Sequence, residues 1–145
     1  MSLGNIFDIA GSGMSAQSVR LNTTASNLAN ADVPAASESE TYRARYPLFS
    51  TVQAQLISQM SGGAAAGNMG AGVSVEGIVE SDAPLQPRFE PAHPLANEEG
   101  YVFYPNVNVV EEMTNMISAS RSFQSNVEVM NATKTMMQRV LTLGQ

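Results

Sequence analysis

Few side chains in this sequence could do catalytic or metal-binding chemistry. His93 is the only histidine, and it stands between Ala92 and Pro94 in a proline-rich stretch. A metal centre or a catalytic triad needs partners at workable spacing, and none is evident nearby. The chain has no cysteine, which excludes disulfides, thiolate zinc sites and cysteine nucleophiles. A loop histidine, exposed or holding a structural hydrogen bond, is the favoured interpretation.

Three further patterns resemble catalytic or cofactor motifs but lack essential parts. Residues 13–17, Gly-Met-Ser-Ala-Gln, miss the final glycine of a nucleophile elbow. The glycines of 62–72 lack both the Lys-Ser/Thr of a P-loop and the glycine order of a dinucleotide fingerprint, so a Gly/Ala linker is favoured. The glutamate pairs 98–99 and 111–112 are adjacent in sequence, so the two side chains of a pair point in different directions. The sequence therefore predicts no enzyme, no cofactor and no metal.

What the chain does contain is helical periodicity at both ends. Apolar and small residues recur there at alternating steps of three and four, a spacing typical of a helix that packs on another helix. The N-terminal stripe is Phe7, Ala10, Met14, Gln17, Leu21, Thr24 and Leu28. The C-terminal stripe is Val109, Met113, Met116, Ser120, Phe123, Val127, Met130, Lys134, Met137 and Leu141. Two such seams indicate a hairpin closed on itself, or helices that pack against copies of the chain.

Capping residues predict where these helices begin and end. Asn5 is a candidate N-cap for a first helix from Ile6 to about Asn30. Asn108, with Glu111 three residues later, forms a capping box for a last helix that runs to about Leu143.

The middle of the chain predicts a small β-rich insert. Residues 41–49 alternate as a strand, which Pro47 confines to a sheet edge. The prolines of 84–94 predict an extended stretch outside any sheet interior, and 52–60 is ambiguous between strand and helix. Further strands are expected at 73–80 and 101–104.

These elements give an α+β fold class, with N- and C-terminal helices paired as a coiled-coil-like stem around a small β-rich central insert. The expected segments are an N-terminal helix in 1–34, the insert in 35–107 with its linker at 62–72, and a C-terminal helix in 108–145.

Composition limits the partners. The formal net charge of −6 argues against nucleic acid, and neither helix has a Lys/Arg-rich face for a membrane surface. No stretch approaches a transmembrane length, and no cleaved signal peptide is expected. With 43% hydrophobic and only 6% aromatic residues, neither helix brings a strong core, so we expect marginal stability in isolation.

The methionines of the last helix allow two interpretations. They fill gaps in a core, or they form a tolerant surface that packs against several different neighbours. Polar residues interrupt the seams at Gln17, Thr24, Ser120 and Lys134. Such interruptions weaken a closed hairpin and are typical of contacts that set register between chains. Both interpretations stay open at this point.

Four stretches resemble the flagellar axial proteins, which comprise rod, hook and hook-associated subunits. Ala-Ser-Asn-Leu-Ala-Asn at 25–30 resembles the signature that closes their first helix. Glu-Pro-Ala-His-Pro-Leu-Ala-Asn at 90–97, with the opening at 5–12 and the ending from 118, is similar to a proximal rod subunit. Residues 50–72 have no recognised counterpart in the compact members of the family.

The resemblance implies a structural, non-enzymatic role in the rod that crosses the periplasm and transmits torque. It implies export without a cleaved signal peptide through the flagellar type III apparatus. The implied partners are that apparatus, other rod subunits and neighbouring basal-body proteins, with no direct membrane insertion. In the family, the terminal helices form an inner layer around the export channel and the central segment lies outside.

We accordingly expect the helices to gain order on assembly, and we expect one set of residues to form the subunit interface. Asn22, Asn27 and Asn30 are candidates for hydrogen bonds across the seam, with ordinary exposed or capping positions as the alternative. The predicted interface is Phe7, Met14, Leu21, Asn22, Asn27, Leu28, Asn30, Met113, Met116, Phe123, Val127, Met130, Met137 and Leu141. The alternatives are another rod subunit type and a soluble helical-hairpin adaptor that binds one partner helix, with an enzyme a remote third.

Overall fold

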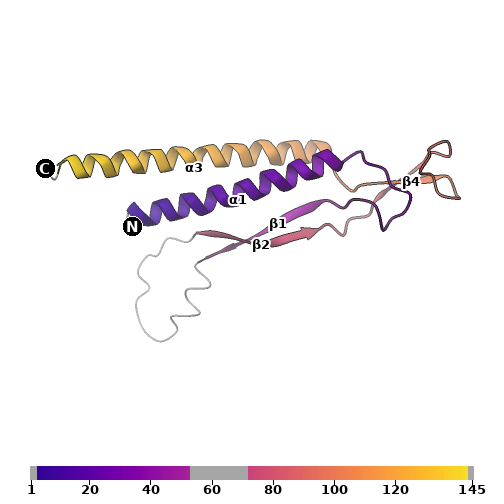
Figure 1. Ribbon diagram of the computed structural model, residues 1–145, viewed down its shortest axis with the longest axis horizontal. Coiled ribbons are helices and arrows are strands. Elements are labelled where there is room, and N and C mark those ends of the chain that lie inside the picture. The colour runs from indigo at the N-terminus through magenta and orange to yellow at the C-terminus, as the bar shows by residue number, and fades with distance from the viewer. Residues whose placement is uncertain (1–2, 53–71, 144–145) are drawn as a thin grey trace, which may run out of the picture. The chain divides into compact units, whose positions relative to one another are not determined.

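The computed structural model describes residues 3–52 and 72–143, and Figure 1 shows the order of its elements. Along the sequence, two long helices at the ends flank a small set of short strands, which confirms the predicted α+β class. The predictions for 52–60 and for the linker at 62–72 fall almost entirely on residues 53–71, outside the described part. The elements are α1 (Leu3–Asn30), β1 (Arg45–Thr51), β2 (Val73–Glu80), β3 (Gln86–Phe89), β4 (Tyr101–Tyr104) and α3 (Val109–Leu143).

The helix ends agree with the sequence at three of four positions. Asn108 caps α3 as predicted, because its Oδ1 atom accepts the backbone N–H groups of Val110 (3.1 Å) and Glu111 (3.4 Å). Helix α1 ends at Asn30 and α3 is described to Leu143, as expected. The predicted start of α1 is wrong, since the helix already begins at Leu3 and Asn5 lies inside it. Asparagine is common at helix N-caps but is also tolerated in the first turn of a helix. An asparagine by itself therefore does not fix the residue at which a helix begins.

The strands form two two-stranded sheets, β1 with β2 and β3 with β4. Pro47 in β1 and Pro87 in β3 therefore both occupy edge strands, where a missing backbone N–H costs little. Strands β3 and β4 are antiparallel, with Pro87 opposite Phe103. On the other side of β4, Ala35 and Phe103 exchange two backbone hydrogen bonds of 2.9 and 3.1 Å. The segment that follows α1 thus pairs with β4 at Ala35.

The tip of the β3–β4 hairpin depends on one glycine. Gly100 has φ of +81°, a conformation that side chains rarely adopt. A Cβ atom there would also come within 2.9 Å of the Phe89 ring, which packs edge-on against Tyr101 at 5.4 Å between centroids.

The chain divides into two compact units, and both helices contribute residues to both of them. Among the described residues, unit 1 contains 3–19, 48–52, 72–77 and 119–143, and unit 2 contains 20–47 and 78–118. The predicted segments 1–34, 35–107 and 108–145 follow sequence order instead and stay a prediction.

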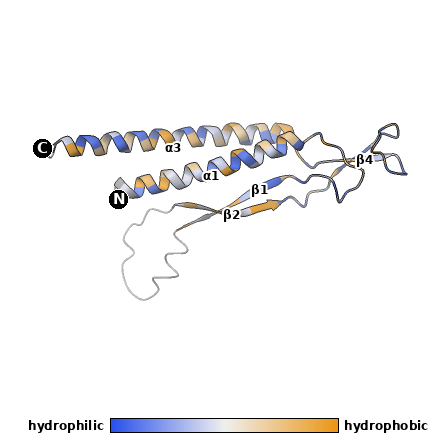
Figure 2. Cartoon of the chain, viewed as in Figure 1, coloured by the Kyte–Doolittle hydropathy of each residue, from blue (hydrophilic) through white to orange (hydrophobic). Residues whose placement is uncertain are grey.

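Alanines make up the described core of unit 1, and unit 2 adds a few larger residues. In unit 1 the buried apolar residues are Ala10, Ala16 and Ala119. In unit 2, Ala31, Ala44 and Val107 form a cluster with Tyr42 packed against it, and Leu85 and Val102 are also buried. Figure 2 shows both helices as a mixture of hydrophilic and hydrophobic residues. Alanines allow close approach but remove little apolar area from water, so the packing inside one chain contributes modest stabilisation.

Candidate assembly interface

The structure assembles no catalytic or metal centre in residues 3–52 and 72–143. His93 lies in the loop after β3, where its Nδ1 atom accepts the N–H of Leu95 at 3.1 Å, a structural hydrogen bond. No group of three His, Cys, Asp or Glu residues in the described part could hold a metal ion. The helices of the described residues include none that is long and apolar enough to cross a membrane. The remaining candidates for a functional site are the surfaces that could bind another protein.

One open cavity of about 780 Å³ lies in unit 2, beside the segment that follows α1. Four of its charged residues form two ion pairs, Arg43 with Glu38 at 3.4 Å and Arg45 with Glu80 at 2.9 Å, and Glu40 also lines it. Both ion pairs are partly exposed to water, so each contributes little stabilisation. The cavity has mostly polar walls and no convergent set of reactive groups.

In unit 1, α1 contacts both α3 and the start of β2. Gly13 lies against Asn126 of α3, and a Cβ atom on Gly13 would come within 2.9 Å of the Asn126 Nδ2 atom. Ser12 makes the contact with β2. Its Oγ accepts the N–H of Val73 at 3.1 Å and donates to the Ile9 carbonyl at 2.9 Å. The buried Oε1 atom of Gln17 has no hydrogen-bond partner among the described residues. Close contact in this unit thus involves small and polar side chains.

In unit 2, a buried carboxylate lies in the seam near the N-terminus of α3. Glu112 is 1% exposed, and neither of its carboxylate oxygens has a hydrogen-bond partner. The Tyr46 hydroxyl lies near this carboxylate without meeting hydrogen-bond geometry. Burial raises the pKa of Tyr46, and the negative charges of Glu112 and Glu111 raise it further. Nearby, the Arg20 guanidinium donates to Asn115 Oδ1 at 2.8 Å and joins the two helices.

Asn27, at the end of α1, connects the helix to the start of β1. Its side chain is fully buried. The Nδ2 group donates to the Arg45 carbonyl at 2.9 Å, while the Oδ1 atom accepts the Arg45 N–H and the Tyr42 hydroxyl, each at 2.9 Å. The amide thus pairs with both backbone groups of one residue, as a neighbouring strand would. The structure assigns Asn27 to the fold of its own chain.

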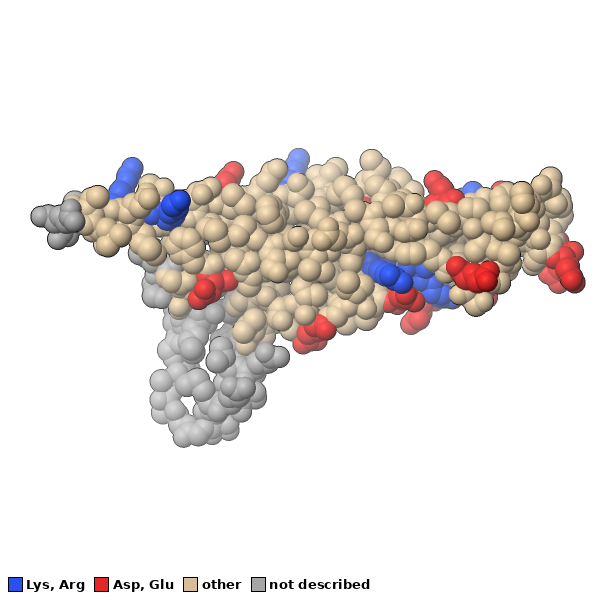
Figure 3. Space-filling view, in the orientation of Figure 1, with Lys and Arg blue, Asp and Glu red and all other residues tan. Residues whose placement is uncertain are grey.

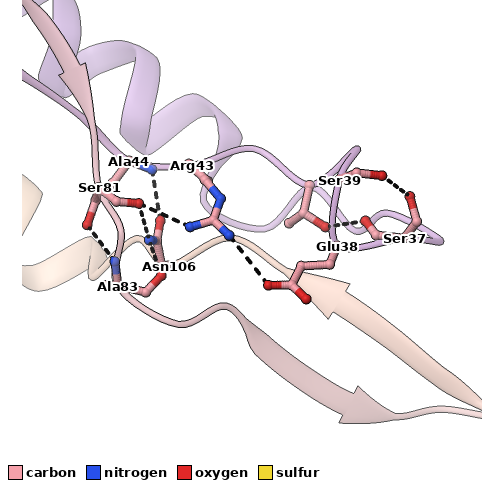
Figure 4. A network of polar contacts seen from close by, with 9 residues as sticks. Ser37, Glu38, Ser39, Arg43, Ala44, Ser81, Ala83 and Asn106 are labelled. Atoms are coloured by element: carbon pink, nitrogen blue, oxygen red, sulfur yellow. Dashed lines mark hydrogen bonds and ion pairs between the residues drawn. The ribbon is translucent and has the colours of Figure 1, made fainter.

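A second asparagine joins the segments around the strands, as Figure 4 shows. Asn106 accepts the N–H of Ala44 at 2.8 Å and donates to the carbonyls of Ala83 (2.9 Å) and Ser81 (3.3 Å). Ser81 also donates its N–H to the Ala44 carbonyl at 2.8 Å, and Arg43 donates to the Ser81 carbonyl at 3.3 Å. This network fixes the chain segments before β1, after β2 and before α3. No local pattern in the sequence pointed to it.

The predicted stripe of α3 consists of two parallel lines of residues, and only one of them is half-buried in the structure. The predicted line through Met116, Phe123, Met130 and Met137 is half-buried. The other predicted line, through Met113 and Lys134, is exposed at these two residues, while the neighbouring residues Glu112 and Thr133 are buried. The line that faces inward therefore runs through Glu112, Ala119, Asn126 and Thr133. Of these four residues, Asn126 lies against α1 at Gly13, where the absence of a Cβ atom permits the close approach.

The predicted interface residues occupy three kinds of position. Asn27 is buried in the fold, and Asn30 donates to the Ser26 carbonyl one turn earlier at 2.8 Å. Asn22 is exposed on α1, Met113 is 52% exposed and Leu141 is 68% exposed. The remaining residues are half-buried: Phe7, Met14, Leu21, Leu28, Met116, Phe123, Val127, Met130 and Met137. Their contacts with other subunits remain a prediction.

The surface of α3 also exposes large apolar residues that sequence reasoning missed. In unit 2, Val110 and Ile117 are 74% and 57% exposed and flank Met113 at helical spacing. In unit 1, Val129, Met136 and Val140 are exposed at steps of seven and four. These residues form a second stripe on α3 beside the predicted one. The same spacing of three and four residues in the sequence could have revealed it. Figure 3 shows charged side chains spread over the visible face, with areas of uncharged side chains between them.

Comparisons with known proteins agree with an assembly role. Residues 7–36 match the family model "Flagella basal body rod protein", and residues 98–143 match "Flagellar basal body rod FlgEFG protein C-terminal". The chain is 50% identical to the flagellar basal-body rod protein FlgC of Salmonella typhimurium and 52% identical to that of Escherichia coli O6:H1. It is 36% identical to the FlgC protein of Bacillus subtilis. Each of these alignments covers 100% of both chains.

The two family models fall on the parts of the chain that contain α1 and α3, where the exposed apolar residues and the close helix contacts lie. The chain therefore belongs to the family of flagellar basal-body rod proteins FlgC.

Proposed function

We propose that this chain is a structural subunit of the proximal rod of the bacterial flagellar basal body. It polymerises through its terminal helices and forms part of the periplasmic drive shaft that transmits torque around the export channel. The observation that carries the proposal is the full-length identity of about half to rod proteins, combined with exposed apolar residues on α3. An isolated helix pair with such a surface is incomplete and is stabilised by burial between neighbouring subunits.

The mechanism is ordering on assembly. Inside each unit the helices contact one another through alanines and polar groups, two of which, Gln17 and Glu112, have buried oxygens without a partner. Neighbouring subunits then supply the apolar contacts that one chain lacks. A chain with marginal helices also suits passage through a narrow export channel in an unfolded form. Export of this chain follows the flagellar type III route without a cleaved signal peptide, and its partners are other rod subunits and neighbouring basal-body proteins.

The test is complementation of a motile bacterium that lacks its own FlgC protein. Expression of this chain should restore swimming and place the chain in purified basal bodies. A failure to restore motility, together with absence of the chain from basal bodies although it is expressed and exported, would refute the proposal. A truncated chain that ends at Ser118 removes most of α3 and serves as the negative control.

A soluble helical-hairpin adaptor is the competing class, and amide NMR of the purified chain at micromolar concentration separates the two. Sharp, poorly dispersed signals from 3–30 and 109–143 are expected for a subunit that becomes ordered on polymerising. Dispersed signals throughout, with helices protected from exchange, would indicate a self-sufficient hairpin.

A further inference from the structure

The carboxylate of Glu112 is buried in the seam of unit 2 without a partner. The side chain is 1% exposed, and neither of its oxygens has a hydrogen-bond partner among the described residues. Removing a carboxylate from water is costly unless a cation or several hydrogen-bond donors replace the lost hydration. The apolar contacts of the proposed assembly do not use this group, so its place in the seam needs another explanation.

A cation lies about one helical turn from this carboxylate. The Arg20 guanidinium of α1 donates from Nη2 to the Asn115 Oδ1 atom at 2.8 Å. Asn115 follows Glu112 by three residues in α3, a spacing that places two Cβ atoms about 5–6 Å apart on one side of a helix. All three residues belong to unit 2. Arg20 forms no ion pair within the described residues, so its charge is not yet compensated.

The two positions open to the Arg20 guanidinium differ in acceptor and in hydration. On Asn115 it meets a neutral amide, and because both residues are half-buried it keeps part of its water. On Glu112 it meets a carboxylate, and a hydrogen bond between two charged groups is about twice as strong as a neutral one. Reaching that buried site removes the remaining water from the guanidinium. Loss of water around Arg20 therefore favours the position on Glu112.

We infer that Arg20 is a latent partner of Glu112, bound to Asn115 in the free chain and moved to Glu112 when a neighbouring subunit covers the start of α3. This trigger rests on the proposed function, whereas the pair itself does not. A neighbour that covers the exposed Val110 and Met113 excludes water from this part of the seam. The assembled subunit then satisfies a charge that weakens the isolated chain, which shifts the equilibrium toward the paired position.

The pair is tested by urea unfolding of the isolated chain in an osmolyte that keeps the marginal helices folded. Glu112→Gln keeps the size of the side chain and removes its charge. In the otherwise unmodified chain it should raise the urea midpoint, because the charge has no partner there. In an Asn115→Leu background the competing acceptor is absent and Arg20 binds Glu112. The same Glu112→Gln change should then lower the midpoint, by about 0.3–1 M. Asn115→Ala serves as the background if leucine prevents folding.

The outcomes distinguish the partner of the carboxylate. Equal effects of Glu112→Gln in the two backgrounds, or a lower midpoint already in the otherwise unmodified chain, would overturn the inference. Adding Arg20→Gln to the Asn115→Leu background should abolish the reversal. A reversal that survives Arg20→Gln and is lost in Tyr46→Phe would assign the partner to the nearby Tyr46 hydroxyl and would also overturn it. Glu111→Gln, at the exposed neighbouring position, is the matched control and should respond equally in both backgrounds.

The trigger is tested by complementation of the strain that lacks its own FlgC protein. Glu112→Gln should reduce the amount of the chain in purified basal bodies several-fold and shrink the swimming halo, although the isolated variant is more stable. A purely structural role predicts no such loss. Glu111→Gln should enter basal bodies at the level of the unmodified chain. An equal loss in Glu111→Gln would attribute the effect to the charge of the α3 start as a whole and would overturn the trigger.

Two further results separate the trigger from the proposed function. Unchanged incorporation of Glu112→Gln overturns the movement of Arg20 on assembly, while the rod assignment stands. Absence of even the unmodified chain from basal bodies overturns the proposed function and the trigger together, and the urea midpoints then still decide whether Arg20 reaches Glu112.

Discussion

Gly13 of α1 lies so close to Asn126 of α3 that a Cβ atom on the glycine would come within 2.9 Å of the asparagine Nδ2 atom. A Cβ atom on Gly11, two residues earlier, would have no neighbouring atom within 4 Å. Two glycines of the same helix therefore have different roles. One permits a close helix contact, and the other only lowers helix propensity.

This difference predicts opposite responses to alanine. Gly11→Ala should raise the free energy of unfolding by about 0.5–1 kcal/mol, the usual gain from replacing glycine in a helix. Gly13→Ala should lose that gain or destabilise, because Asn126 has to move. The measurement is urea unfolding followed by circular dichroism, with an osmolyte that keeps marginal helices folded. An equal gain in both variants would mean that the contact with Asn126 imposes no constraint.

The asparagines of α1 predict a second contrast. Asn27→Ala removes three hydrogen bonds from a fully buried site and leaves Arg45 backbone groups without that partner. It should destabilise the fold by about 2–3 kcal/mol. Asn22→Ala, at an exposed position of the same helix, should change stability by less than about 0.5 kcal/mol. Both values come from denaturant unfolding in the same osmolyte, which keeps the marginal helices folded, and comparable losses in the two variants would contradict the role assigned to Asn27.

The buried carboxylate of Glu112 predicts a stabilising substitution. Glu112→Met replaces an unpartnered buried charge with an apolar side chain of similar length and should stabilise the isolated chain by about 1–2 kcal/mol. Part of the gain is offset, because the acidic group near the helix N-terminus interacts favourably with the helix dipole. Glu111→Met is the exposed control and should have little effect on stability. A loss of stability in Glu112→Met would indicate that the carboxylate has a favourable partner.

Tyr46 predicts a dependence of stability on alkaline pH. Its pKa is raised in the folded chain above the ordinary value of about 10. The folded state therefore releases its proton less readily than the unfolded state, so the contribution of Tyr46 to stability is constant below pH of about 10 and falls as the pH rises from there through the folded pKa. Tyr46→Phe should flatten this decline, whereas Tyr101→Phe, which leaves Tyr46 and its acidic neighbours unchanged, should retain it. Unfolding curves collected between about pH 8 and 11.5 measure the effect, and an unchanged slope in Tyr46→Phe would refute it.

The sequence by itself determined the two helices, the edge strand around Pro47 and the family resemblance. A heptad period sustained over many turns is visible without a structure, and Asn108 marks the start of its helix through a local side-chain bond. Pro47 confines its strand to a sheet edge for a reason that belongs to the residue itself, whereas the strand that contains Pro87 was expected only as an extended stretch. The motif at 25–30 pointed to the flagellar axial proteins, which the full-length relatives confirm.

Only the tertiary structure decided which line of α3 faces inward. Hydropathy ranks Met113 above Glu112, yet the closest contacts use Glu112, Ala119 and Asn126 because the distance between helices depends on the partner, here Gly13. The role of Asn27 was also decided by the tertiary structure. Its hydrogen-bond partner Arg45 lies 18 residues away, so the bond forms only where the loop after α1 brings that residue back beside the helix. Periodicity describes one helix at a time, whereas these contacts depend on the separation of two segments, which no local pattern encodes.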